Sequence, residues 1–214
     1  IMGPSGSGKT TLLHMLSGMD RPTAGTVTLG GRELTGLGER ELADVRLRHI
    51  GFVFQEPHLL QSLDLRDNIV LPGLLAGERP RSEIVARAEE LMSDIGIASI
   101  ADHLPGQASG GQLQRAGICR ALINGASVVF GDEPTGALNQ AMSQQILDVL
   151  SRLNDAGTTL ILVTHDPQVA ARASRLVILV DGRLTDDLKL GAYSAREHEE
   201  RMSPVREVMA ARGI

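Results

Sequence analysis

Short apolar runs alternate with stretches of helical periodicity along most of the chain. Runs rich in Val, Ile, Leu and Phe predict strands, and apolar residues repeated every three or four positions predict helices. We expect strands at residues 26–29, 49–55, 126–130, 159–164 and 176–180. We expect helices at residues 10–16, 142–154 and 167–173, and another that follows residue 109. This alternation predicts an α/β fold with a mainly parallel sheet flanked by helices.

A helical insert interrupts the alternation between residues 67 and 102. Its apolar residues, among them Ile84, Ala88 and Leu91, share one helix face behind a predicted Ser82 cap. We expect a helical subdomain at about residues 60–125.

The C-terminal part of the chain has a different character. The DGRL stretch at 181–184 predicts a hairpin turn, and the Arg- and Glu-rich residues 195–212 predict an exposed helix with a solvated surface. We therefore expect one domain at residues 1–184 and a C-terminal helical tail at 185–214.

Composition narrows the class of protein. Hydrophobic residues make up 42% of the 214 residues and charged residues 22%, as in ordinary globular proteins. The formal net charge is -5 and basic residues are scattered, so a nucleic-acid partner is not expected. Neither a membrane span nor a signal peptide is evident. The single cysteine, Cys119, lies among apolar residues at helical spacing and is expected in the core.

The strongest motif lies at the N-terminal end of the chain. GPSGSGKT fits the pattern G-x-x-x-x-G-K-[ST] of a phosphate-binding loop, between a strand end and a helix. Its backbone N–H groups and Lys9 can surround the phosphates of a nucleotide, and the Thr10 hydroxyl can bind Mg²⁺. These features predict a P-loop NTPase. The phosphate-binding set is Gly3, Pro4, Ser5, Gly6, Ser7, Gly8, Lys9, Thr10 and Thr11.

Two adjacent acids follow the apolar run Val128–Phe130. An acid at a strand end near a phosphate loop can hold Mg²⁺, and we assign this role to Asp132. Glu133 is placed to accept a proton from the water that attacks the γ-phosphate. The pair therefore predicts hydrolysis of a nucleoside triphosphate as well as its binding.

A second anion site is predicted 100 residues after Lys9. A hydroxyl and flexible backbone N–H groups meet there at the start of a helix. The residues are Ser109, Gly110, Gly111 and Gln112.

With these motifs in order, the chain resembles the nucleotide-binding subunit of ATP-binding cassette (ABC) transporters. The resemblance covers residues 1–184 and adds Gln55 as the Q-loop glutamine and His165 as the switch histidine. It implies that Gln55 contacts Mg²⁺ or the attacking water, and that His165 positions water with Glu133. It also implies a head-to-tail dimer in which residues 109–112 of one subunit reach the ATP of the other.

The resemblance further implies a place and a partner. The chain is similar to the family of macrolide exporters and lipoprotein-release ATPases, and most similar to the branch that resists antimicrobial peptides such as bacitracin. An integral-membrane permease is then the partner, and the chain lies peripherally at the cytoplasmic face of the plasma membrane. The exported or removed cargo is an antimicrobial peptide, a lipoprotein or a hydrophobic drug.

Three features depart from the family pattern. Ala108 stands where Leu is usual, and Asn139 stands where the D-loop usually has Asp; we expect activity with both. The sequence before the phosphate loop is short, so the first strands and the aromatic residue that stacks on adenine are expected to be missing. For the 214 residues alone this predicts weak nucleotide binding and low stability.

Other functions stay open at this level. A nucleotide-sensing or inactive truncated cassette is favoured by the short N-terminus and disfavoured by Glu133 and His165. A non-transport ABC ATPase of DNA repair would have long coiled coils between residues 9 and 109, and one of translation would carry two cassettes.

Overall fold

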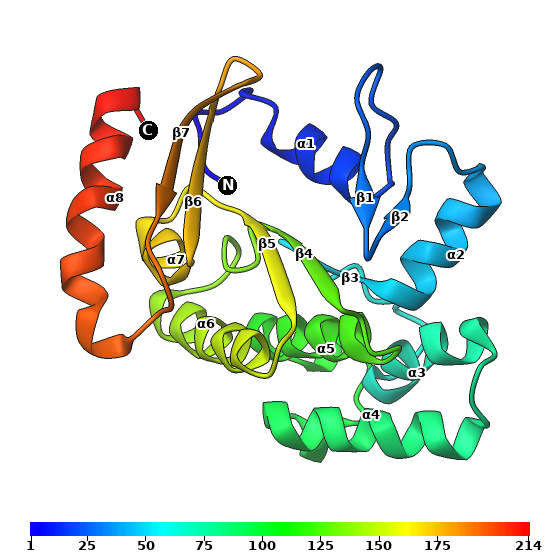
Figure 1. The fold of residues 1–214 in the computed structure, drawn as a ribbon. Helices are drawn as coiled ribbons and strands as arrows, with labels where there is room; N and C mark the ends of the chain where they lie inside the picture. The colour runs from blue at the N-terminus through cyan, green and yellow to red at the C-terminus, as the bar shows by residue number, and fades with distance from the viewer.

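The computed structural model describes all residues, 1–214, and has a parallel sheet at its centre (Figure 1). The sheet order is β3-β4-β5, and every pair is parallel. The strands are β3 (Ile50–Phe54), β4 (Val128–Asp132) and β5 (Thr159–Val163). Their apolar sequences suit strands covered on both faces. The α/β prediction with a mainly parallel sheet is confirmed.

The first two residues extend this sheet toward the C-terminal hairpin. Ile1 O accepts a hydrogen bond from Thr164 N at 3.1 Å, beside the end of β5. Met2 N donates to Val177 O at 2.8 Å, and Leu179 N donates to Met2 O at 2.8 Å. Residues 1 and 2 therefore lie between β5 and β6 (Arg175–Val180), and they fix the start of the phosphate loop at the carboxyl edge of the sheet.

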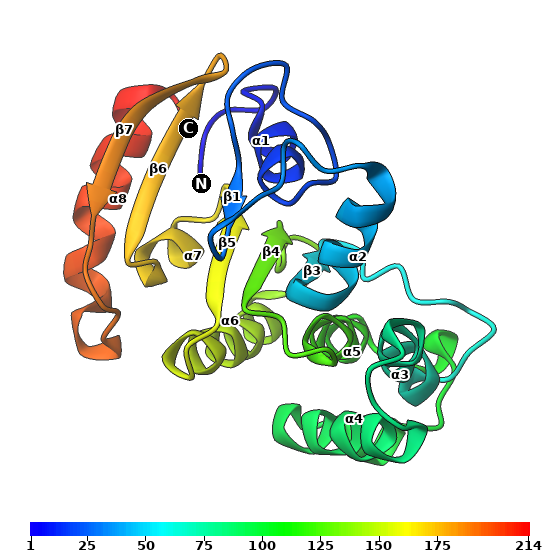
Figure 2. The ribbon, with the colours of Figure 1, turned by 45° about the vertical axis from the view of Figure 1, so that its right-hand side comes forward.

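Helices cover both faces of the sheet. Helix α1 (Lys9–Leu16) contacts β4 and β5 on one face, whereas α5 (Gly110–Leu122) and α6 (Gln140–Asp155) lie on the other (Figures 1 and 2). The short hairpin of β1 (Thr28–Leu29) and β2 (Arg32–Glu33) stands near α1. Helix α2 (Glu39–His49), which no pattern predicted, leads directly into β3.

The predicted helical insert is present and packs as a unit. Helix α3 (Leu65–Ala76) and helix α4 (Arg81–Ile95) contact each other and α5. The Ser82 cap was wrong, because the N-cap residue of α4 is Pro80, two residues earlier, and the helix begins at Arg81. Extended backbone at Pro80 starts this helix without a side-chain cap. The 3₁₀ turns η1 (Ala98–Ile100) and η2 (Pro105–Gln107) complete the insert.

The end of the chain packs against the domain. After α7 (Pro167–Arg172) and β6, the predicted turn leads into β7 (Arg183–Lys189), which runs past residue 184. The tail becomes helical only at η3 (Ala195–Glu197) and α8 (His198–Arg212). The predicted helix is present and most of its residues are exposed or half-buried, but one side is buried, because Met202 and Val205 share a buried cluster with Met2 and Ile178.

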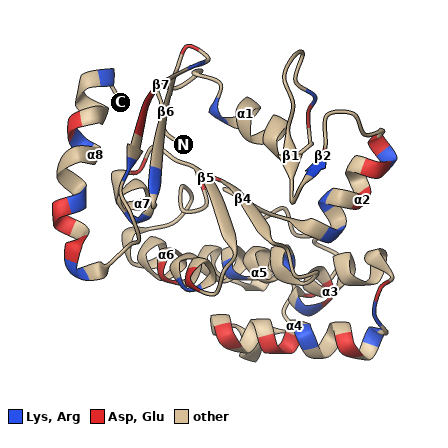
Figure 3. Ribbon diagram, viewed as in Figure 1, with Lys and Arg blue, Asp and Glu red and all other residues tan.

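The helices show neither a surface of one charge nor the apolar length of a membrane span. Helices α2, α4 and α8 each carry acidic and basic residues together, and no face of one sign stands out in this view (Figure 3). None of the helices combines the length and the apolar character that a membrane crossing needs.

Cys119 is expected to resist alkylation until the protein unfolds. The residue is buried in the main core, as predicted, and burial raises the pKa of its thiol to about 12. Little of the reactive thiolate then exists at neutral pH. Mass spectrometry after iodoacetamide treatment at pH 8 should show no label in the native chain and one label in denaturant. Rapid native labelling would contradict the core position.

Candidate functional site

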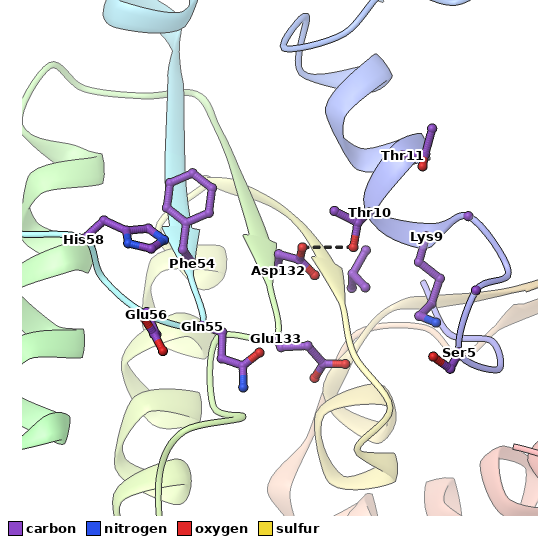
Figure 4. A pocket seen from close by; sticks show the side chains of 13 residues that line it. Ser5, Lys9, Thr10, Thr11, Phe54, Gln55, Glu56, His58, Asp132 and Glu133 are labelled. Carbon is purple, nitrogen blue, oxygen red and sulfur yellow. Dashed lines mark hydrogen bonds between the residues drawn. The ribbon is translucent and has the colours of Figure 1, made fainter.

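A phosphate-sized loop connects Met2 to α1. Gly6 and Gly8 have φ angles of 78° and 95°, in the left-handed region that favours glycine. At Gly3, an added Cβ would lie 2.0 Å from Leu179 O, so only glycine fits beside β6. The Lys9 Nζ donates to Gly3 O at 2.9 Å and to Pro4 O at 2.8 Å, which holds the ammonium group inside the loop (Figure 4).

Helix α1 presents its free end to the same loop. Its N-cap residue is Gly8, and no side chain accepts a hydrogen bond from the first turn. The first N–H groups of a helix lack partners within the helix and carry its positive dipole end. Together with Lys9 they can bind an anion such as a phosphate group.

The carboxyl ends of the central strands bring acids to this loop. Phe54, Asp132 and Val163 are register partners across β3, β4 and β5, so the residues that follow them meet at one edge. The Thr10 Oγ1 donates to Asp132 Oδ2 at 3.0 Å (Figure 4). This hydroxyl and this carboxylate lie 122 residues apart in sequence, and both are oxygen donors of the kind that Mg²⁺ prefers.

Glu133 lies at the centre of a small polar group. Its Oε1 is 2.7 Å from His165 Nδ1, and its Oε2 accepts a hydrogen bond from Thr164 Oγ1 at 3.3 Å. Its φ of 48° is rare for a residue other than glycine and turns the chain sharply after β4. The Glu133 side chain is 17% exposed, whereas that of His165 is 72% exposed. The carboxylate is thus oriented by two side chains yet open to water.

A pocket of about 670 Å³ joins these parts. The predicted residues at its wall are Ser5, Gly6, Gly8, Lys9, Thr10, Thr11, Gln55, Asp132 and Glu133. Phe54, Glu56 and His58 also line it and were not predicted. The Phe54 and His58 rings lie 5.7 Å apart beside Gln55 (Figure 4). The only sign in the sequence that Phe54, Glu56 and His58 belong to the site is that they lie within three residues of Gln55.

The second predicted anion site has its own geometry. Ser109 caps α5, with Ser109 N donating to Gln112 Oε1 at 2.8 Å and Gln112 N donating to Ser109 Oγ at 3.4 Å. Neither residue lines the pocket, and Gly110 and Gly111 do not line it either. The chain therefore does not bring its two predicted anion sites together.

The side chain of Asn139 caps the start of helix α6. Its Oδ1 accepts a hydrogen bond from Met142 N at 3.0 Å and so caps α6. Asn and Asp cap helices about equally well, so the unusual Asn keeps this local structure.

Comparisons with known proteins agree with this geometry. The ABC transporter family model matches residues 1–136. The chain is 46% identical to macrolide export ATP-binding/permease protein MacB 1/2 of Paracoccus denitrificans (strain Pd 1222), over 91% of this chain and 29% of that protein. It is 47% identical to MacB of Rhodopseudomonas palustris (strain HaA2), over 92% of this chain and 30% of that protein. The chain thus spans about three-tenths of the length of these relatives.

A solved structure gives the same fold. The dimeric ATP-binding cassette MJ0796, in a post-hydrolysis state with ADP and Pi, superimposes with a TM-score of 0.81 at 37% identity. The match covers 90% of this chain and 84% of that one. A family model over more than half of the chain, high identity to relatives and the shared fold agree, and the chain belongs to the ABC transporter family.

Proposed function

We propose that the chain binds ATP with Mg²⁺, hydrolyses it, and drives a membrane permease as the ATP-binding subunit of an exporter. The observation that carries this proposal is the meeting of Lys9, Thr10, Asp132 and Glu133 at one pocket. A phosphate-binding loop, a metal-binding acid and a proton acceptor are the parts that ATP hydrolysis needs.

The phosphate loop binds the nucleotide in this proposal. Lys9 and the backbone of residues 3–8 surround the β- and γ-phosphates, and Thr10 and Thr11 lie at the start of α1. Residues 109–112 complete the site of a second subunit in a head-to-tail dimer. Their position outside the pocket, on a separate capped helix start, supports this arrangement.

The oxygen donors of Thr10, Asp132 and Gln55 fit a magnesium ion. Mg²⁺ usually takes one or two protein oxygens and completes its shell with water and substrate phosphates, so three neutral or anionic oxygens suffice. When bound, the ion neutralises charge on the phosphates. The protein's part is to hold these oxygens at the edge of the sheet, as the Thr10–Asp132 hydrogen bond does.

Glu133 accepts the proton of the attacking water. His165 and Thr164 hold its carboxylate from two sides, so its free lone pairs face the open pocket. The exposed His165 contacts this carboxylate but does not line the pocket itself. We assign it a contact with the γ-phosphate from the resemblance to the family. These roles follow from the contacts within the chain and from the resemblance to the family.

The permease and cargo follow from the relatives. Their names join an ATP-binding part with a permease for macrolide export, and we infer the same kind of partner here. The chain then lies peripherally at the cytoplasmic face of the plasma membrane. The cargo is a hydrophobic drug, an antimicrobial peptide or a lipoprotein, and the names of the relatives favour the drug.

A nucleotide-sensing subunit is the second candidate. The test is steady-state phosphate release by the chain with and without its permease in lipid vesicles. We expect Mg²⁺-dependent turnover that the permease increases. Binding without turnover under both conditions would instead support a sensor.

Thr164→Val is expected to lower kcat about 3- to 30-fold without weakening ATP binding, because it removes one hydrogen bond to a charged group. Thr164 is buried and also accepts a hydrogen bond from Asp166 N at 3.0 Å, so its hydroxyl is fixed. Valine keeps the shape of the side chain, and Thr164→Ser keeps the hydroxyl as the matched control. Phosphate release and nucleotide titration measure the two constants. Equal losses in both variants would show that packing, and not the hydroxyl, is what matters.

A further inference from the structure

One face of helix α5 contacts the segment of residues 54–58. Gln114, Gly117 and Arg120 are spaced three residues apart, so they lie along the same side of the helix. The Gln114 Nε2 donates to Phe54 O at 2.9 Å. The Arg120 guanidinium donates to His58 O at 2.9 Å and to Pro57 O.

Gly117 allows the helix to approach this closely. A Cβ added there would lie 3.2 Å from Pro57 Cβ, so α5 and the segment are in direct contact between the two side-chain anchors. The strand before the segment is equally close, since a Cβ at Gly51 would lie 2.6 Å from Ala121 O. The contact therefore continues along α5 for about two turns, from Gln114 to Ala121.

After Phe54, which is paired with Asp132 in the sheet, the segment is largely exposed. Gln55, Glu56 and His58 are exposed, and His58 has a φ of 48°, which is costly for a residue other than glycine. Gln114 is buried and Arg120 is half-buried, so the hydrogen bonds to Phe54 O and Pro57 O are partly shielded from water, whereas the bond to His58 O is exposed. Burial also lowers the pKa of Arg120, a cost that the two carbonyl groups offset.

Gln55 is the residue of this segment that faces the chemistry. A Cβ added at Gly136 would lie 3.1 Å from Gln55 Nε2 and 3.3 Å from Glu133 Cβ. The Gln55 amide thus lies beside the turn that carries Glu133, at the wall of the pocket (Figure 4). A small movement of the segment would move this amide relative to Glu133 and Asp132.

We propose that Gln114 and Arg120 are positioning residues that set the place of Gln55 through the backbone carbonyls of residues 54, 57 and 58. The inference rests on the proposed function, because it assigns Gln55 a part in hydrolysis. Helix α5 also begins at the capped turn of residues 109–112. The place of Gln55 is therefore tied to the same rigid helix that carries the second anion site.

A double-mutant cycle on the full chain tests this inference. Arg120→Met removes the donors and keeps a long side chain, and Gln55→Ala removes the amide that is to be positioned. We expect Arg120→Met to lower kcat about tenfold when Gln55 is present and less than about twofold in the Gln55→Ala background, because contacts that act through one another are not additive. An equal loss in both backgrounds overturns the proposal.

Arg115→Met is the matched control on the same helix. Arg115 donates to Ile95 O at 3.1 Å and to Gln145 Oε1 at 2.5 Å, away from residues 54–58. Any loss it causes should be equal in both backgrounds, and a loss that depends on Gln55 as strongly as that of Arg120→Met overturns the proposal. If Arg120→Met shows no cooperative unfolding, Gln114→Met replaces it in the cycle with the same expectation.

Different results would overturn the proposed function and the positioning role of Gln114 and Arg120. Turnover that is insensitive to both Lys9→Ala and Glu133→Gln would overturn the proposed function and this inference with it. Turnover that needs Lys9 and Glu133 but shows no coupling between Arg120 and Gln55 would overturn this inference alone.

Discussion

Glu133→Gln is expected to lower the turnover of ATP about 10²- to 10⁴-fold, which is the usual contribution of a positioned proton acceptor. Glutamine has nearly the shape of glutamate and can keep contacts with Thr164 and His165, which lie 3.3 and 2.7 Å from the carboxylate oxygens. It cannot accept the proton of the attacking water. ATP binding should persist, because the phosphate contacts come from residues 3–10. Single-turnover phosphate release measures the first quantity, and titration with a fluorescent ATP analogue measures the second.

Glu56→Gln is the matched control for this change. Glu56 lines the same pocket and is exposed, but it lies on the β3 side, away from the Thr164 and His165 contacts of Glu133. Its replacement removes the same charge from the same pocket. Turnover within about twofold of the original is expected, as for a surface substitution outside a specific network. An equal loss in the two variants would assign the effect to the charge of the pocket, and unchanged turnover in Glu133→Gln would remove Glu133 from the proposed role.

The meeting of the site residues was predictable because motif and topology act together. Each of Gln55, Asp132 and His165 comes at or just after an apolar run, and parallel strands place their carboxyl ends at one edge of a sheet. The observed register of Phe54, Asp132 and Val163 then brings the following residues together. Sequence reasoning needed no distances for this step.

Elements held by tertiary contacts were harder to predict. Helix α2 is mostly charged and buries only Leu42 and Val45, so its periodic signal is weak. Helix α8 looks solvated in sequence, yet Arg201 is buried and donates to the carbonyls of Ala173 and Ala192. A buried arginine is stable only with such partners, and no local pattern shows that they exist.

The contact between α5 and residues 54–58 is a tertiary contact that the sequence did not predict. Gln114 and Arg120 follow the segment by about 60 residues. Glutamine and arginine in a helix ordinarily predict a solvated face. Only the fold shows that these two side chains reach backbone carbonyls. Hydrogen bonds from a side chain to a distant backbone have no period or motif, and so they cannot be read from sequence.

Lys9→Ala is expected to weaken the binding of ATP about 10- to 100-fold, because a charge-assisted hydrogen bond and a positive charge beside the phosphates are lost. Two donors of the Lys9 ammonium already hold Gly3 O and Pro4 O, at 2.9 and 2.8 Å. An ammonium group has three N–H donors, so one is left for a phosphate oxygen. The positive charge stays inside the loop, where in the proposed function it acts on the β- and γ-phosphates together with the free end of α1.

Lys189→Ala is the matched control, since Lys189 is the chain's only other lysine and is exposed on β7. The same titration should give unchanged affinity for this variant, and thermal unfolding should show that both variants are folded. Unchanged affinity in Lys9→Ala would contradict the phosphate role of the loop.

The two predictions also distinguish the binding of ATP from the chemical step. Lys9→Ala should act mainly on affinity and Glu133→Gln on turnover, because the proposed function gives Lys9 the binding of the phosphates and Glu133 the transfer of the proton.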